Sequence, residues 1–120
     1  MSQAPRINEV DLPLVEECIQ SILDVVEFAQ DNPSAKVRVA SVKAVQDECF
    51  ALVTFLALNL GSPPPEWAVA RLRPMVEAAQ HMTECVEALT PSEAAWDLAC
   101  EALTDACHRM RDAARVGQPG

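Results

Sequence analysis

Residues 11–31, DLPLVEECIQSILDVVEFAQD, decide the fold. Their apolar side chains recur at steps that alternate between three and four residues, at Leu12, Val15, Ile19, Ile22, Val26 and Ala29. Because an α-helix has about 3.6 residues per turn, this spacing collects the apolar side chains on one side of a helix. The stretch therefore predicts an amphipathic helix with one apolar seam turned toward other helices.

The same spacing recurs in three later stretches, each long enough for a helix. The further seams are Val42, Val45, Cys49, Leu52 and Leu56; Ala68, Leu72, Met75, Ala79, Met82, Val86 and Leu89; and Trp96, Ala99, Leu103, Ala106, Met110 and Ala113. Four such helices joined by short connections predict an all-α fold, an antiparallel up-down four-helix bundle over residues 11–115. A flexible lead at 1–10 and a disordered tail at 116–120 complete the predicted organisation.

Local signals mark the helix ends. Asp11 and Ser34 suit the N-cap positions of the first two helices, and Gly61 suits a left-handed stop after Leu60. Residues 90–93, Thr-Pro-Ser-Glu, predict a capping box with proline at the first helical position. Pro74 falls inside the third seam without shifting its phase, so we expect one helix that is kinked there.

Charge and composition exclude several classes of function. The chain has 120 residues and a net charge of -9, whereas nucleic-acid binding and anionic membranes both require a basic face. The longest nearly apolar run, Cys49 to Leu60, is far shorter than the roughly 20 residues of a membrane span. With no signal-peptide core in the first 12 residues, we expect a cytoplasmic protein whose partner is another protein, with a basic partner fitting the charge.

The five cysteines are odd in number, lack C-x-x-C spacing and lie on or beside the seams: Cys18, Cys49, Cys85, Cys100 and Cys107. Reduced, core-filling thiols are therefore expected rather than a disulfide framework. Some copper-storage proteins are four-helix bundles lined with thiols, which leaves a metal-binding alternative open. The seven-residue spacing of Cys100 and Cys107 does not favour it, and we predict no metal site and no cofactor.

The second helix carries more apolar surface than one seam can bury. Phe50, Val53, Phe55, Ala57 and Leu58 extend beyond the seam and point nearly all round the helix. A helix that is apolar on every side is buried on every side, so this set predicts an interface with another chain, as a homodimer or in a heteromer. The alternative is that the proline-rich connector or the N-terminal segment covers it.

Two charged surfaces are also predicted. Carboxylates on the outer sides of the first and fourth helices would merge into one acidic wall where these helices are neighbours, with a solvated face as the plain alternative. The wall comprises Asp97, Glu101, Asp105, Asp112, Glu16, Asp24 and Glu27. Up-down topology would also gather Arg71, Arg73, Arg109 and Arg111 at one pole, where an anion or an acidic peptide would dock. Cations near a helix C-terminus also complement the helix dipole, which accounts for Arg109 and Arg111.

His81 supports a further alternative. Its position on a helix face, in a bundle of this length, resembles histidine phosphotransfer domains, which implies phosphate transfer to that imidazole. In that family lysine follows the histidine at the third position and glycine at the fourth, whereas this chain has Glu84 and Cys85. The sequence therefore favours a non-enzymatic, acidic protein-interaction module such as an adaptor, an inhibitor or immunity-type protein, or a small chaperone. The alternatives are a ligand- or metal-binding bundle and a degenerate phosphotransfer domain.

Overall fold

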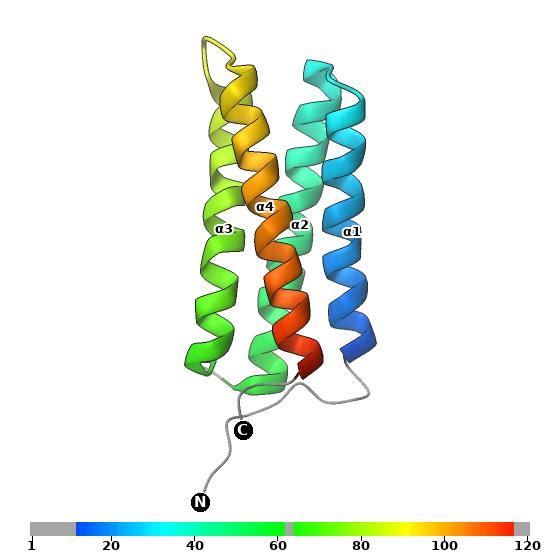
Figure 1. The fold of residues 1–120 in the computed structure, drawn as a ribbon, viewed down its shortest axis with the longest axis vertical. Helices are drawn as coiled ribbons and strands as arrows, with labels where there is room; N and C mark the ends of the chain where they lie inside the picture. Colours follow the sequence, from blue (N-terminus) through cyan, green and yellow to red (C-terminus); the bar gives the residue numbers. More distant parts are fainter. Residues whose placement is uncertain (1–11, 62–63, 117–120) are drawn as a thin grey trace, which may run out of the picture.

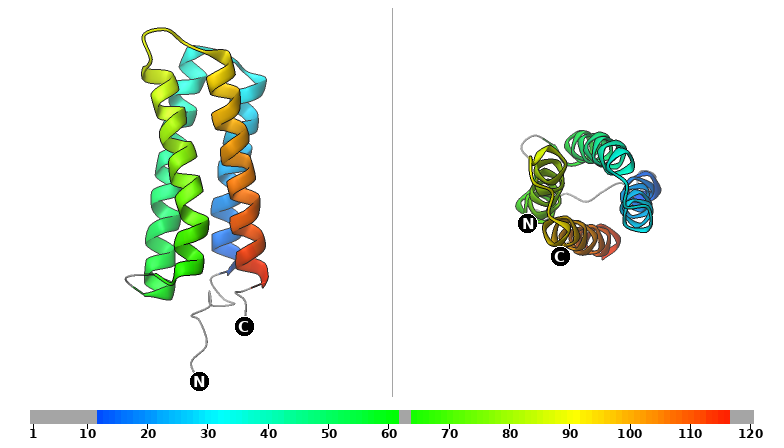
Figure 2. Two further views of the ribbon diagram at one scale, coloured as in Figure 1. Left: turned by 60° about the vertical axis from the view of Figure 1, so that its left-hand side comes forward. Right: turned by 90° about the horizontal axis from the view of Figure 1, so that it is seen from above.

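The computed structural model describes residues 12–61 and 64–116, and it places nearly all of them in four α-helices. The helices are α1 (Leu12–Asp31), α2 (Ala35–Leu60), α3 (Glu66–Glu87) and α4 (Glu93–Val116). In Figure 1 the chain ascends α1, descends α2, ascends α3 and descends α4. Both α1 and α3 pack against α2 and α4, so α2 and α4 stand at opposite corners (Figure 2). The predicted all-α four-helix fold is confirmed.

One hydrophobic core fills the space between the helices, and the predicted seams supply most of it. One seam position, Leu89, was predicted wrongly. Leu89 is fully exposed, because α3 ends at Glu87 and leaves Leu89 in the connection to α4. Ala113 is half-buried and its neighbour Ala114 is buried. The seam of α4 is wider than predicted, because Cys100, Cys107 and Ala114 form a second buried row at seven-residue spacing.

The helix ends follow the sequence signals in part. Ser34 caps α2 as predicted, with its Oγ accepting a hydrogen bond from the Val37 backbone N–H at 3.1 Å. Gly61 has the positive φ expected, 97°, but its ψ of 171° places it outside the left-handed helical region. The capping box at Thr90 is wrong, because Ser92 is the residue whose Oγ accepts from the Ala95 N–H, at 3.2 Å.

Glu93 is instead the first residue of α4, and its carboxylate binds Arg38 of α2. Arg38 Nη1 and Nη2 donate to the two carboxylate oxygens at 2.8 and 2.7 Å, and the guanidinium lies 4.9 Å from the centre of the Trp96 ring. The Arg38 side chain is only 13% exposed, whereas that of Glu93 is 72% exposed. This contact, the Arg38 brace, joins the two helices that stand at opposite corners of the bundle.

Further predictions concern Pro74, the two ends of the chain and membrane-spanning helices. Helix α3 continues through Pro74, and a bend of its axis there stays a prediction. The cap at Asp11, the lead at 1–10 and the tail at 117–120 lie outside the described residues, while Val116 still belongs to α4. None of the described helices combines the length and the hydropathy that crossing a membrane requires.

The Arg38 brace is expected to stabilise the bundle more than an ordinary surface ion pair does. Arg38→Met should lower the free energy of unfolding by about 1–2 kcal/mol, because a bidentate pair and a cation–π contact are lost together. Lys43→Met is the matched control, since Lys43 pairs with Asp47 at 3.8 Å between exposed side chains. Its effect should stay below about 0.5 kcal/mol in urea unfolding. Equal losses of unfolding free energy in the two variants would show that the Arg38 brace contributes no more than a surface ion pair.

The brace should also weaken in acid. Arg38 holds the pKa of the Glu93 carboxyl below its ordinary value of 4.5, mainly through the hydrogen bonds. A carboxyl whose pKa is lower in the folded state contributes stability above its unfolded pKa and loses it as the pH falls through the folded pKa. The stability difference between the wild type and Glu93→Gln should therefore be constant near neutral pH and shrink below about pH 4.5. A difference that persists in strong acid would show that ionisation of Glu93 is not its source.

Candidate functional site

An uncovered apolar groove runs between α2 and α3. Phe50 and Val53 of α2 and Val76 of α3 form its walls, and buried Cys49 and Ala79 form its floor. The groove encloses about 260 Å³. Phe50 is 75% exposed, so nothing among the described residues covers it. We call Phe50, Val53 and Val76 the α2–α3 surface.

The structure does not bring the whole predicted interface together. Successive residues of an α-helix are rotated by about 100°, so five apolar residues between positions 50 and 58 cannot share one face. Phe55 is half-buried and packs against the core from the other flank of α2. Leu58 is 82% exposed and points away from the core, while Ala57 is half-buried beside the α2–α3 surface.

Neutral polar side chains border the α2–α3 surface, and charged side chains of both signs lie farther out on the two helices. Gln46 Nε2 donates to Thr83 Oγ1 at 2.7 Å and closes the groove at one end. The Lys43–Asp47 pair lies on α2, with Asp47 about one turn and Lys43 about two turns before Phe50. On α3, exposed Arg73 and Glu77 flank Val76. The polar residues that line the groove itself are neutral, Gln46, Gln80 and Thr83, and the charged residues lie outside it.

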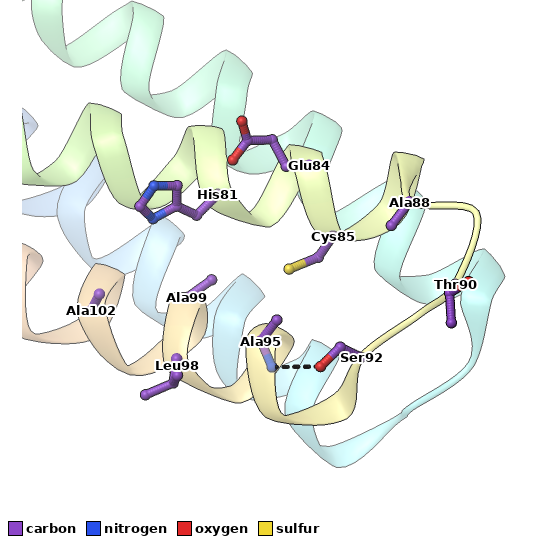
Figure 3. Close-up of a pocket in the computed structure, with 10 residues that line it drawn as sticks. All are labelled: His81, Glu84, Cys85, Ala88, Thr90, Ser92, Ala95, Leu98, Ala99 and Ala102. Carbon is purple, nitrogen blue, oxygen red and sulfur yellow. Dashed lines mark hydrogen bonds between the residues drawn. The ribbon is translucent and has the colours of Figure 1, made fainter.

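A second and larger groove, about 580 Å³, lies between α3 and α4. Figure 3 shows small side chains of both helices directed into it, with Cys85 on one side and Ala95 and Ala99 on the other. Leu98 stands at its α4 edge and is 67% exposed. Glu84 also lines this groove, with its carboxylate directed away from α4 (Figure 3).

The predicted acidic wall forms only in part. Asp97, Glu101 and Asp105 line one groove of about 720 Å³ beside α1, where Gln30 is the residue from that helix. Asp112 and Glu27 are exposed. The remaining α1 carboxylates do not join this groove, because Glu16 pairs with Arg115 at 3.1 Å and Asp24 lines the groove between α1 and α2.

The four arginines of the predicted anion pole do not converge on one point. Residues two apart on a helix are rotated by about 200°, so Arg71 and Arg73 point in nearly opposite directions, and so do Arg109 and Arg111. Two of them already have partners within the chain. Arg109 pairs with Asp105 at 3.1 Å, and Arg111 donates to Gln20 at 3.3 Å and to His108 Nδ1 at 2.7 Å. The arrangement offers single cations rather than an anion site.

The cysteines fall into two groups. Cys49 lies near Cys18 and Cys107, and Cys85 lies near Cys100. Burial raises the pKa of the Cys49 and Cys100 thiols to about 11 and that of Cys107 to about 12. No set of three or more histidine, cysteine, aspartate or glutamate side chains in residues 12–61 and 64–116 is placed to hold a metal ion.

Sequence reasoning missed the Arg38 brace and the groove between α3 and α4. A signal for the groove is present, since Ala95, Ala99 and Ala102 recur at i, i+4 and i+7 and so share one flank of α4. The partner row has the same spacing, with His81 and Cys85 on α3 and Ala88 directly after its end. Facing rows of small side chains leave space between two helices, but only the structure shows that these two rows face each other. No comparable signal in the sequence connects Arg38 with Glu93, which lies 55 residues later.

Thiol labelling tests the placement of the cysteines. A pKa of about 11 instead of 9.0 lowers the thiolate fraction near neutral pH by about 100-fold, and only the thiolate reacts with iodoacetamide. We expect Cys49, Cys100 and Cys107 to stay unlabelled in the folded protein and all five cysteines to label in urea. Cys85 should label first, because it is half-buried and lines the groove between α3 and α4. Mass spectrometry of digested samples reports each site, and rapid labelling of Cys107 would contradict the structure.

The chain matches no protein-family model, no curated protein and no solved structure. Its function therefore has to be inferred from its own surfaces.

Proposed function

We propose that this chain is a helical protein-interaction module that docks through the α2–α3 surface. The observation that carries the proposal is the exposure of Phe50 beside Val53 and Val76 over an apolar groove. Burying one large apolar side chain contributes about 1.5–3 kcal/mol, and aromatic anchors in pockets dominate the affinity of most interfaces. A contiguous apolar surface of this kind is typical of a docking site.

The occupant we propose is a second copy of the chain. In a two-fold symmetric dimer the same surface meets itself, so it must be complementary to itself in charge. The lining of the groove is neutral, and charges of both signs lie on the exposed sides of the two helices, Lys43 and Asp47 on α2 and Arg73 and Glu77 on α3, so no excess of one sign opposes the approach of a second copy. A surface of one charge would repel its own copy. Self-association would also cover Phe50, which the described part of the chain leaves exposed.

Binding, rather than catalysis, is the activity that these features support. The raised pKa values of the thiols do not favour thiolate metal ligands at neutral pH. Glu84 stands one turn after His81, where the phosphotransfer family has lysine, and a carboxylate there would not steady a phosphoryl group on that imidazole as the lysine does. A cytoplasmic location goes with the proposal, because five unpaired thiols persist best in a reducing compartment.

The native mass tests this proposal. Wild-type protein should behave in light scattering as a dimer of the 13.0 kDa chain, and Phe50→Asp should behave as a helical monomer, since a buried unpaired carboxylate opposes association. Leu98→Asp is the matched control, because Leu98 is also an exposed apolar residue on a helix but belongs to α4. We expect this variant to remain dimeric.

A wild-type monomer at high micromolar concentration would overturn the proposal. So would a Phe50→Asp variant that assembles like the wild type while its circular dichroism stays helical.

A further inference from the structure

The outer side of α4 carries a docking surface that is distinct from the α2–α3 surface. Leu98 projects between two grooves, the apolar groove toward α3 and the acidic groove beside α1. Ala102 also lines both grooves and lies four residues after Leu98, on the same side of the helix. We call Leu98 and Ala102, with the carboxylates of Asp97, Glu101 and Asp105 in the acidic groove, the α4 outer surface.

The apolar part of this surface has the dimensions of a helix contact. Ala95, Ala99 and Ala102 span seven residues of α4, which is about 10.5 Å or two helical turns. Alanine side chains allow another helix to approach closely, and Leu98 supplies a projecting apolar side chain beside them. A docked helix would place residues at i, i+3, i+4 and i+7 along this groove.

The charged part of this surface is acidic. Asp97, Glu101 and Asp105 line the acidic groove, whereas Glu84 borders the apolar groove with its carboxylate directed away from α4 (Figure 3). Histidine is the only basic residue type that lines either groove within the described chain, at His81 and His108. The Arg109–Asp105 pair offsets one of these carboxylates at 3.1 Å, and it leaves Asp97 and Glu101 to face a partner. Their charge is part of the net charge of -9 of the whole chain.

We propose that the α4 outer surface binds a cationic amphipathic helix of another protein. Apolar side chains of that helix enter the groove between α3 and α4, and its lysines or arginines reach Asp97 and Glu101. The sign of the charge decides between occupants here. A second copy of this chain would bring carboxylates against carboxylates, whereas a basic segment is attracted at long range and held at short range. This surface and the α2–α3 surface therefore serve different partners.

A synthetic peptide probes this surface directly. The probe is a fluorescein-labelled amphipathic peptide of about 18 residues with leucines at i, i+3, i+4 and i+7 and lysines elsewhere, titrated by fluorescence anisotropy against the whole chain. Two matched peptides serve as controls, one with every lysine replaced by glutamate and one with the leucines scrambled over all sides. We expect the patterned lysine peptide to bind at least tenfold more tightly than either control. Its affinity should fall as NaCl is raised from about 50 to about 500 mM.

Substitutions then locate the binding surface. Leu98→Ser removes the projecting side chain and Ala102→Gln fills the groove, and each should weaken binding at least tenfold. The double variant Asp97→Asn, Glu101→Gln should weaken binding and reduce its dependence on salt. The control variants Phe50→Ser on α2 and Glu17→Gln on α1 should bind like the wild type. All of the substituted side chains are exposed, and circular dichroism checks that each variant stays folded.

The outcomes separate this surface from the proposed dimer. Tight binding of the peptide supports the α4 outer surface if Leu98→Ser and Ala102→Gln abolish it and Phe50→Ser leaves it unchanged. This conclusion holds whether the chain is a monomer or a dimer. Equal binding of the patterned and scrambled peptides would mean that charge alone holds them, and would overturn the proposal. Loss of binding in Phe50→Ser, with Leu98→Ser unchanged, would also overturn it and move the site to the α2–α3 surface.

Discussion

Burial of four apolar seams in a single core is the constraint on which the rest of the structure depends. Side chains such as Ile19, Leu52, Met82 and Leu103 are almost completely withdrawn from water. Each contributes about 1.5–3 kcal/mol, whereas an exposed ion pair contributes at most about 1 kcal/mol. The seams therefore set how each helix is rotated about its own axis, and the surface contacts adapt to that rotation. One helix can turn only part of its circumference toward the core, so any further apolar residue must lie elsewhere.

The surfaces proposed for binding follow from that geometric limit. On α2 the apolar residues that cannot face the core lie mainly on the flank toward α3, where Phe50 and Val53 meet Val76. On α4 the flank toward α3 carries alanines, which are too small to fill the space between the helices. The two surfaces differ in the charges around them, mixed in the first case and acidic in the second. Because electrostatic complementarity governs which partners approach, this difference matters more for specificity than the size of either groove.

The ends of the bundle are held by side chains from helices that are distant in the sequence. Arg38 reaches from α2 to Glu93 and Trp96 on α4, and at the other end Arg115 of α4 binds Glu16 of α1. Both carboxylates were assigned other roles from sequence, Glu93 to a capping box and Glu16 to the acidic wall. A carboxylate can cap a helix, face solvent or form an ion pair. Which of these it does depends on the cations that lie near it in space. Two buried nitrogens at the first of these contacts, Arg38 Nε and Trp96 Nε1, have no hydrogen-bond partner in the described chain.

The sequence by itself determined the four helices, the seam of each helix and the capping of α2 by Ser34. These depend on interactions within a few residues and on a period of about 3.6 residues that can be read directly. It also indicated the surplus apolar residues of α2, but not that Phe50 and Phe55 lie on opposite flanks with different neighbours. Only the tertiary structure decided which flank of one helix faces which flank of another. The packing of the shared core sets how far each helix is rotated about its axis. That rotation places small side chains opposite each other between α3 and α4, separates the carboxylates of the predicted acidic wall and directs the arginines apart.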